Sequence, residues 1–327
     1  MDSYLNLSLP DFLVAAAQTP AMLRLKEVGM NCGCEYTSFP RFVNLPPYSR
    51  WQHSVCVGAI VWHFTLEPRQ ALAGLLHDIA TPTFAHVIDF LHGDAMTQES
   101  TEAGTQEIIE DSQELQGILA DLGFKTEDVC DYHLYPIADN PSPQLSADRL
   151  EYTLSNLVNY GFRAPADCRR YFDDLLVDTN EHGEVELVFQ THEIALGFAS
   201  GALQCSRVYI SDEDRYAMQA LADLLRTAVH DRIIDEHDFY GTEGRLIQKL
   251  LRDSKYARQW AAYRALHALV ISGEPQNGPG WINVSAKKRT IDPFVKGSGR
   301  VSELYPDYAN SLSDFQMASQ NYWMSGE

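Results

Sequence analysis

Basic residues are scarce in this chain, which has 25 Lys and Arg against 45 Asp and Glu and a net charge of -20. This excess of acidic groups argues against a general nucleic-acid surface and against a surface for anionic membranes. A polyanionic substrate would therefore need a locally basic pocket.

Paired cysteines and long apolar runs are also missing. The six cysteines show no CxxC spacing, so we interpret Cys32 and Cys34 as packing residues rather than as a metal site. The longest apolar stretches, such as residues 71–76, are too short to cross a bilayer. No charged-then-apolar leader opens the chain and free thiols are typical of a cytoplasm, so we expect a cytoplasmic protein with no membrane partner.

Helical periodicity dominates what is present. With 327 residues and 45% hydrophobic content, the chain is long enough to bury one or two full cores. Apolar residues recur at three-to-four spacing, which predicts helices over residues 54–64, 69–77, 83–91, 101–122, 147–160 and 212–234. The fold class predicted is mostly α.

Minor β elements are expected beside these helices. Residues 183–190 alternate as a strand does, and residues 281–284 and 290–295 are predicted to pair with each other. The Gly- and Pro-rich segment 273–280 is the clearest linker. We therefore expect a helical body over residues 1–272, with a site core at about 45–160, and a C-terminal tail lobe over 273–327 packed on the body.

Four side chains near predicted helix ends could close on one divalent metal ion. They are His53, the adjacent pair His77 and Asp78, and the much later Asp148. Imidazole and carboxylate ligands together suit Mn, Fe, Ni, Zn or Mg. Taken singly, each has a plainer explanation, since a lone His is usually structural and Asp148 could be a helix-start carboxylate. Their combination favours a metal centre.

Three segments surround these residues: residues 50–57 read RWQHSVCV, residues 77–89 read HDIATPTFAHVID and residues 146–152 read SADRLEY. They resemble the HD-domain metal-dependent phosphohydrolases, most closely the branch of deoxynucleoside triphosphate triphosphohydrolases. The family reads approximately R-F-E-H-S-x-G-V, H-D-x-G-H-x-P-F-S-H-x-F-D and D-x-D-[KR]-x-D-Y. Residues 19–25, TPAMLRL, also resemble its T-P-x-x-x-R-L run. The resemblance covers about residues 5–255 and implies an HD-domain helical bundle.

The resemblance also implies roles for individual side chains. His53, His77, Asp78 and Asp148 match the metal ligands. His86 matches a catalytic histidine, and Asp89 one turn later would orient it and support general acid–base work, although His86 could also be a buried structural residue. Candidate substrate-binding residues are Arg50, Arg149, Tyr152, Arg232 and Tyr240. Guanidinium groups suit phosphate oxygens, and the tyrosines would line the sugar pocket.

Departures from the family pattern concern the substrate. Thr81 and Gln98 stand where the triphosphohydrolases carry phosphate-handling histidines, and Asn156 stands where an Asp commonly reads the sugar hydroxyl. His133, 15 residues before Asp148, raises the alternative of a second metal, but one ion is favoured. The repeated dipeptides at residues 230–231 and 237–238 lack further ligands in context and are not expected to bind metal.

The function predicted is metal-dependent phosphohydrolysis, in which metal-activated water attacks phosphorus. Nucleotides, above all deoxynucleoside triphosphates or relatives, are the favoured substrates. The alternatives are a phosphomonoesterase or phosphodiesterase acting on another phosphorylated metabolite, and a nucleotide-binding regulatory HD protein with weakened turnover. By analogy with the branch we also expect a homo-oligomer.

Overall fold

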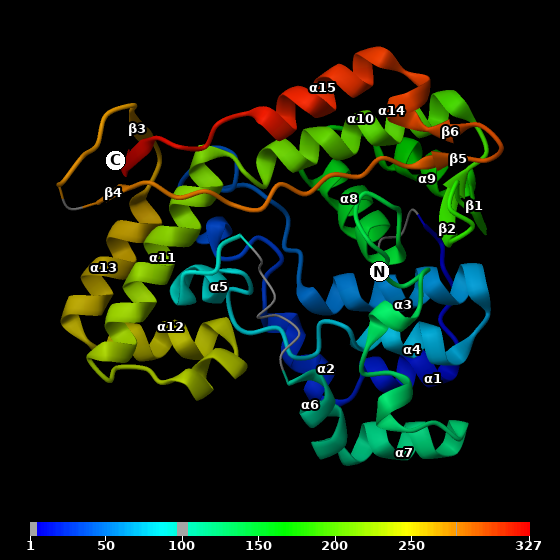
Figure 1. Cartoon of the computed structure of the whole chain (residues 1–327). Coiled ribbons are helices and arrows are strands. Elements are labelled where there is room, and N and C mark those ends of the chain that lie inside the picture. Colours follow the sequence, from blue (N-terminus) through cyan, green and yellow to red (C-terminus); the bar gives the residue numbers. More distant parts are fainter. Residues whose placement is uncertain (1–4, 97–103, 279) are drawn as a thin grey trace.

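The computed structural model describes residues 5–96, 104–278 and 280–327. Helices dominate them, which confirms the mostly α fold class (Figure 1). The α-helices are α1 (Asp11–Ala17), α2 (Pro20–Leu23), α3 (Arg50–Thr65), α4 (Pro68–Leu76), α5 (Val87–His92), α6 (Thr105–Asp111), α7 (Gln113–Leu122), α8 (Ala147–Asn159), α9 (Pro165–Asp173), α10 (His192–Val208), α11 (Asp212–His230), α12 (Glu243–Arg252), α13 (Ser254–Ala265), α14 (Val301–Leu304) and α15 (Pro306–Met317). Short 3₁₀ helices are η1 (Arg24–Glu27), η2 (Cys34–Tyr36), η3 (Thr126–Asp128), η4 (Tyr132–Leu134) and η5 (Glu236–Tyr240).

Three of the predicted helices are shorter than expected by more than one residue, and the one predicted over 212–234 ends at His230. The helix predicted over 101–122 is divided into α6 and α7 at Ser112, whose hydroxyl caps α7 by accepting the Leu115 N–H at 3.3 Å. The helix predicted over 83–91 begins only at Val87, because Phe84 and Ala85 have positive φ angles of 60° and 45°. Left-handed backbone at two non-glycine residues is costly and is often found at functional sites.

Helix α3 is the central helix of the larger core. Ser49 and Gln52 form a capping box at its start, and its residues are buried along most of its length. Gly58 allows a close approach of α4, since a Cβ there would lie 3.0 Å from the Leu75 Cβ. A helix covered on nearly all sides is apolar all round, which explains why residues 54–61 show little polar alternation. The close packing of α3 on α4 fixes where their ends meet.

Two small sheets complete the fold, built from β1 (Leu175–Thr179), β2 (Val185–Phe189), β3 (Leu269–Ser272), β4 (Trp281–Ile282), β5 (Phe294–Val295), β6 (Gly299–Arg300) and β7 (Trp323–Gly326). The strand orders are β1-β2-β5-β6 and β3-β7-β4. The pairing predicted between residues 281–284 and 290–295 is wrong, because β4 pairs with β7 whereas β5 pairs with β2 and β6. The segment between them crosses the molecule instead of turning back (Figure 1).

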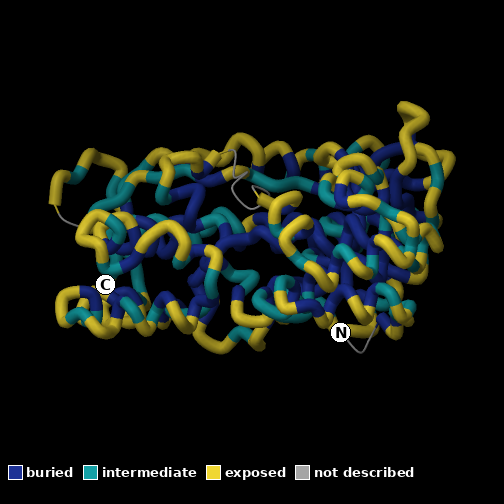
Figure 2. Tube along the Cα trace, turned by 90° about the horizontal axis from the view of Figure 1, so that it is seen from below, coloured by how far each residue is buried: buried dark blue, intermediate teal, exposed yellow. Residues whose placement is uncertain are grey.

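The buried residues form two hydrophobic cores. One gathers around α3, α4, α8 and α10, and the other around α5, α11 and α13. Figure 2 shows the buried parts of the chain running inside an exposed outer layer. The residues after 272 extend over both cores, and their strands join sheets that begin in the body. The proposed boundary at 272 stays a prediction.

None of the described helices is both long and apolar enough to span a membrane.

Candidate metal centre

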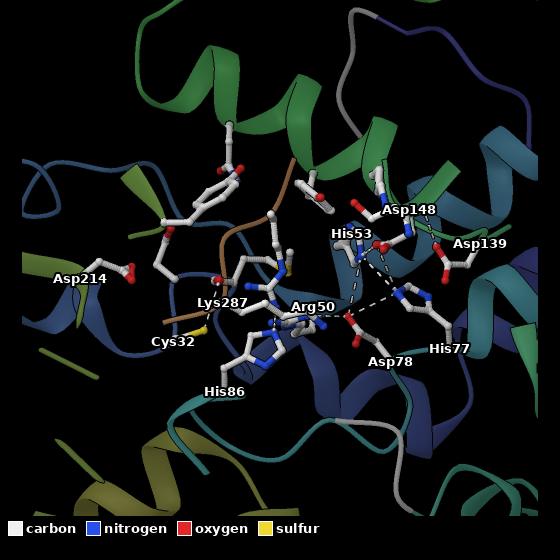
Figure 3. A pocket seen from close by; sticks show the side chains of 18 of the residues that line it. Cys32, Arg50, His53, His77, Asp78, His86, Asp139, Asp148, Asp214 and Lys287 are labelled. Atoms are coloured by element: carbon white, nitrogen blue, oxygen red, sulfur yellow. Dashed lines mark hydrogen bonds and ion pairs between the residues drawn. The ribbon is translucent and has the colours of Figure 1, made fainter. Parts of the chain in front are cut away.

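Side chains from α3, from the two residues that follow α4 and from α8 converge at one point. The Nε2 atoms of His53 and His77 lie 3.2 Å apart, and Asp148 Oδ1 lies 3.0 Å from the first and 3.7 Å from the second. Asp78 Oδ2 is close by, at 3.8 Å and 3.6 Å from the same two nitrogens. Figure 3 shows these groups facing one another at one end of a pocket. The structure thus brings together all four residues predicted as metal ligands.

Both histidines are oriented by hydrogen bonds from the far side of their rings. His77 Nδ1–H donates to the Gly74 carbonyl at 2.7 Å, and His53 Nδ1–H donates to the carboxylate of Glu151. Glu151 is itself held by the Tyr48 hydroxyl at 2.5 Å and the Ser155 hydroxyl at 2.8 Å. Such partners leave the Nε2 lone pairs free to face a cation, the arrangement seen around ligating histidines.

The charges around the convergence point also favour a cation. Burial lowers the pKa of His53, but Glu151 and Asp148 outweigh it and raise that pKa to about 10. Burial acts against ionisation of Asp148 too, yet His53 and His77 hold the pKa of this carboxyl at about 2. A proton and a divalent ion compete for the same negative field, so the donor set fits a metal of the predicted kind.

Asp78 is fixed by two further side chains. Arg50 Nη1 donates to Asp78 Oδ2 at 2.9 Å, and the Thr81 hydroxyl donates to Oδ1 at 2.7 Å. Arg24, from the entry motif, donates to the Ile79 and Thr81 carbonyls at 2.9 Å and 2.8 Å. Thr81 therefore orients a ligand, and Arg24 holds the turn that carries it.

His86 lies at the edge of the same cavity. Its Nδ1–H donates to Asp89 Oδ2 at 3.0 Å, as the three-residue spacing suggested, and its Nε2 lies 3.3 Å from Arg289 Nη2. Burial lowers the pKa of His86 to about 4, helped by Arg289 and Arg50 and opposed by Asp89. The imidazole is therefore neutral at physiological pH, and its unprotonated Nε2 faces the Arg289 guanidinium.

Basic side chains gather in the cavity although the chain is acidic, and Asp78, Asp139, Asp148 and Asp214 line it as well. It has a volume of about 380 Å³, near the lower end of ligand pockets in general. Arg50, Arg149, Lys287 and Arg289 line it beside the metal-ligand cluster. Lys288 also lines it, but its ammonium donates to the carbonyls of Gln316 and Ala318 and so fastens the tail.

Arg149 and Tyr152, two of the residues predicted to bind substrate, line this cavity, and Asn156 lines it too. Arg149 Nη1 lies 2.9 Å from Asp139 Oδ1 and 2.8 Å from Asn140 Oδ1, so its guanidinium is held in place. Tyr152 packs edge-on against Tyr209, with ring centroids 6.1 Å apart.

Arg232 and Tyr240 do not line the cavity. Arg232 is exposed in the turn after α11, and Tyr240 is 47% exposed at the end of η5. The second metal raised for His133 has little support, because its ring is half-exposed and contacts Asp131 and Asp139 rather than the ligand cluster.

The aspartates of the other two His-Asp dipeptides pair with lysines. Asp231 accepts from Lys255 at 2.7 Å, and Asp238 accepts from Lys249 at 2.5 Å.

Gln98, the second position that departs from the family's histidines, lies outside the described residues.

Sequence reasoning missed two contributors to the site. Glu151 stands three residues after Asp148, on the same helical face, and this spacing could have identified it. Residues 287–289 form the one run of three consecutive basic residues in the sequence, a signal of a basic pocket in an acidic chain. Their distance along the chain from the HD motifs concealed their place in the site.

Replacing Glu151 by Gln should lower metal affinity by roughly 10- to 100-fold, the usual scale for a partner that orients a ligand. The amide no longer offers His53 a charged acceptor. Metal titration by calorimetry measures the change, and Glu114→Gln, an exposed site on α7, is the matched control. Equal affinities in the two variants would contradict the orienting role.

Arg289→Ala should move the acid-side fall of kcat/KM to higher pH. The base must be unprotonated, so activity falls as pH drops through the pKa of His86, near 4 in the native protein. Removing the Arg289 charge should raise that pKa toward 6.5. Arg289→Lys keeps the charge, so in this variant kcat/KM should fall at the same acid pH as in the native protein. If the acid-side fall of kcat/KM is unshifted in Arg289→Ala, a group other than His86 controls it.

Comparisons with known proteins bear on this geometry. No protein-family model matches the chain. The sequence is 26% identical over 266 residues to the uncharacterized protein YdhJ of Bacillus subtilis, covering 78% of each chain. It is 28% identical over 260 residues to the metal-dependent phosphohydrolase cns2 of Cordyceps militaris, covering 76% of this chain and 72% of that protein.

A solved structure shares the fold. The crystal structure of a hypothetical protein from Aquifex aeolicus superposes with a TM-score of 0.66 at 16% identity, covering 97% of this chain and 93% of the other. The name of cns2 agrees with the metal-dependent phosphohydrolases that the motifs resemble, while the triphosphohydrolase branch stays a prediction.

Proposed function

We propose that this chain is a metal-dependent phosphohydrolase that acts on nucleotides. The observation that carries the proposal is the meeting of two buried imidazole nitrogens and a carboxylate oxygen, all within 4.8 Å of one another, in a cavity that arginines and lysines also line. Similarity to a protein named metal-dependent phosphohydrolase supports the general reaction.

The metal would be held by His53, His77, Asp78 and Asp148. A bound divalent ion supplies Lewis acidity, which polarises a phosphoryl oxygen and lowers the pKa of a water molecule. The chain's own part is to hold the phosphate and move protons. Arg50, Arg149 and Arg289 offset charge that develops on phosphate oxygens, and neutral His86, oriented by Asp89, accepts a proton at Nε2.

Two reactions on nucleotides are candidates. The motif resemblance favours the hydrolysis of deoxynucleoside triphosphates. A phosphomonoesterase is the second candidate, because the Thr81 hydroxyl is already bound to Asp78 and Arg149 to Asp139. Fewer free donors then remain for a long phosphate chain in a cavity of about 380 Å³. The predicted homo-oligomer and the regulatory HD protein are further proposals.

Phosphorus NMR of the products distinguishes these candidates. The metal-loaded protein is incubated with deoxynucleoside 5′-triphosphates and 5′-monophosphates. Release of tripolyphosphate supports the triphosphohydrolase, and orthophosphate from monophosphates supports the phosphomonoesterase. Binding of nucleotide without any product would favour the regulatory alternative. The absence of both binding and product would contradict a nucleotide enzyme.

A further inference from the structure

Arg149 and Arg289 differ in whether a carboxylate pairs with them. Arg149 of α8 is paired, since its Nη1 lies 2.9 Å from Asp139 Oδ1. Arg289 of the tail contacts the His86 ring at 3.3 Å, and among the described residues no carboxylate forms an ion pair with it. The charge of Arg149 is therefore balanced, whereas Arg289 keeps its positive charge for a phosphate group.

These two arginines lie on opposite sides of the metal-ligand cluster. Asp139 is beside Asp148 in Figure 3, whereas Lys287 and His86 lie on the other side of the four ligands. Arg289 is on the His86 side, because the two side chains are in contact. The tail thus places two cations on the side of the cluster away from Asp139.

Carboxylates balance the positive charge at the Asp139 end of the cavity. Asp139 Oδ2 lies 3.5 Å from His133 Nε2, and Asp131 Oδ1 lies 3.1 Å from Nδ1 of the same ring. Burial raises the pKa of the Asp139 carboxyl, while Arg149 acts to lower it and favours the carboxylate. A phosphate group placed beyond the ligands would therefore meet negative charge on both sides of His133.

The aromatic rings suited to a nucleoside lie along α8, away from Asp139. Asp139 is near the start of this helix, since the Ser146 hydroxyl that caps it donates to Asp139 at 3.2 Å. Tyr160 caps the other end and lines the cavity. Tyr209 lines it too and accepts from the Asn156 amide at 2.8 Å. Because bases stack on aromatic rings, a nucleotide with a phosphate at the metal would extend its nucleoside in this direction.

We propose that the reaction is confined to terminal phosphate groups, and that Asp139 sets this limit. This role of Asp139 rests on the proposed nucleotide function and specifies which bond is cleaved. With its terminal phosphate at the metal, a nucleotide directs any further phosphate groups past Lys287 and Arg289. Attack at the α phosphorus of a triphosphate would instead direct two phosphate groups toward Asp139, and repulsion between like charges in a partly buried site opposes this.

Each cleavage then releases one orthophosphate. The oxygen of water bonds to the terminal phosphorus, and the bond from that phosphorus to the ester or bridging oxygen breaks. The leaving oxygen keeps the electron pair, and an ester oxygen then takes a proton from solvent. The proton that water loses passes to His86. A monophosphate thus gives a nucleoside, and a triphosphate gives a diphosphate.

Phosphorus NMR of the first products tests the proposal, using the metal-loaded protein with deoxyadenosine 5′-monophosphate and 5′-triphosphate. We expect orthophosphate from both and no tripolyphosphate. Asp139→Asn removes a negative charge and releases Arg149, so about a tenth or more of the triphosphate turnover should then give tripolyphosphate. Asp223→Asn removes the carboxylate of another Asp–Arg pair, on α11, and should keep the native products.

Calorimetry gives a readout that does not depend on turnover. In the proposed orientation Lys287 lies beside the α and β phosphates of a triphosphate. Lys287→Ala should weaken binding of β,γ-methylene deoxyadenosine triphosphate by about 10-fold, the scale of one charged hydrogen bond, and binding of the 5′-phosphonate analogue of the monophosphate by less. Lys296→Ala, on the tail where Lys296 pairs with Asp178, should bind both ligands as the native protein does.

Tripolyphosphate as a first product of the native protein would overturn the proposal, and so would native products in a folded Asp139→Asn. Should that variant not fold, equal weakening of both ligands by Lys287→Ala would contradict the orientation. If p-nitrophenyl phosphate gives orthophosphate but no nucleotide does, the nucleotide function fails while the hydrolysis of terminal phosphate groups is retained.

Discussion

Replacing His77 by Ala should remove most of the bound divalent metal and abolish measurable phosphate release. The variant loses one of the two Nε2 atoms that face each other at 3.2 Å. Loss of a ligand should weaken binding by more than the roughly 10- to 100-fold expected for an orienting partner. Asp78→Ala should have a similar effect and also leaves the buried Arg50 without its carboxylate. Elemental analysis of the purified variants gives the metal content.

His133→Ala is the matched control for His77→Ala. His133 lines the same cavity but lies outside the ligand cluster, so this variant should keep about one equivalent of metal. A halved content relative to the native protein would instead indicate a second ion. Thermal unfolding of each variant separates metal loss from loss of fold. Full metal in both His77→Ala and Asp78→Ala would disprove the site.

His86→Ala should lower kcat by about 100-fold or more while leaving the metal content near normal, because general acid–base groups contribute on this scale. Among the described residues, the ring of His86 contacts the side chains of Asp89 and Arg289, and it contacts none of the four predicted metal ligands. Steady-state kinetics on the best nucleotide substrate measures the loss.

The control for His86→Ala lies six residues on, at the end of the helix that His86 precedes. His92 is exposed there, and His92→Ala should retain native kinetics. Asp89→Asn should give an intermediate loss, because the imidazole keeps its place but loses its charged partner. Unchanged kcat in His86→Ala would reduce His86 to a structural residue.

The four residues predicted as metal ligands lie together in the structure, and the sequence could point to them because each belongs to a local motif. His53 and Asp148 lie in the first turns of α3 and α8, which the capping residues Ser49 and Ser146 begin, and the pair at 77–78 directly follows the end of α4. Periodicity likewise located α3, α4, α8 and α11 to within a few residues at their starts. Local sequence patterns thus indicated the part of the site whose residues lie at the ends of helices.

What the sequence did not predict depends on contacts between distant segments. Arg289 lies 203 residues from His86 along the chain, and only the path of the tail across both cores joins them. The strand partners of β4 and β5 are likewise set by that path rather than by their own alternation. Arg232 and Tyr240 show the converse, since a matching local pattern did not bring them to the cavity wall.

X-ray absorption spectroscopy at the edge of the bound metal tests the central claim most directly. The native protein should show two imidazole ligands together with oxygen ligands, with metal–nitrogen distances of about 2.0–2.1 Å if the ion is zinc. His53→Ala, where it retains metal, should show one imidazole fewer, and His133→Ala should show both. A native spectrum with no imidazole contribution, or one unchanged in His53→Ala, would contradict a metal centre built on His53 and His77.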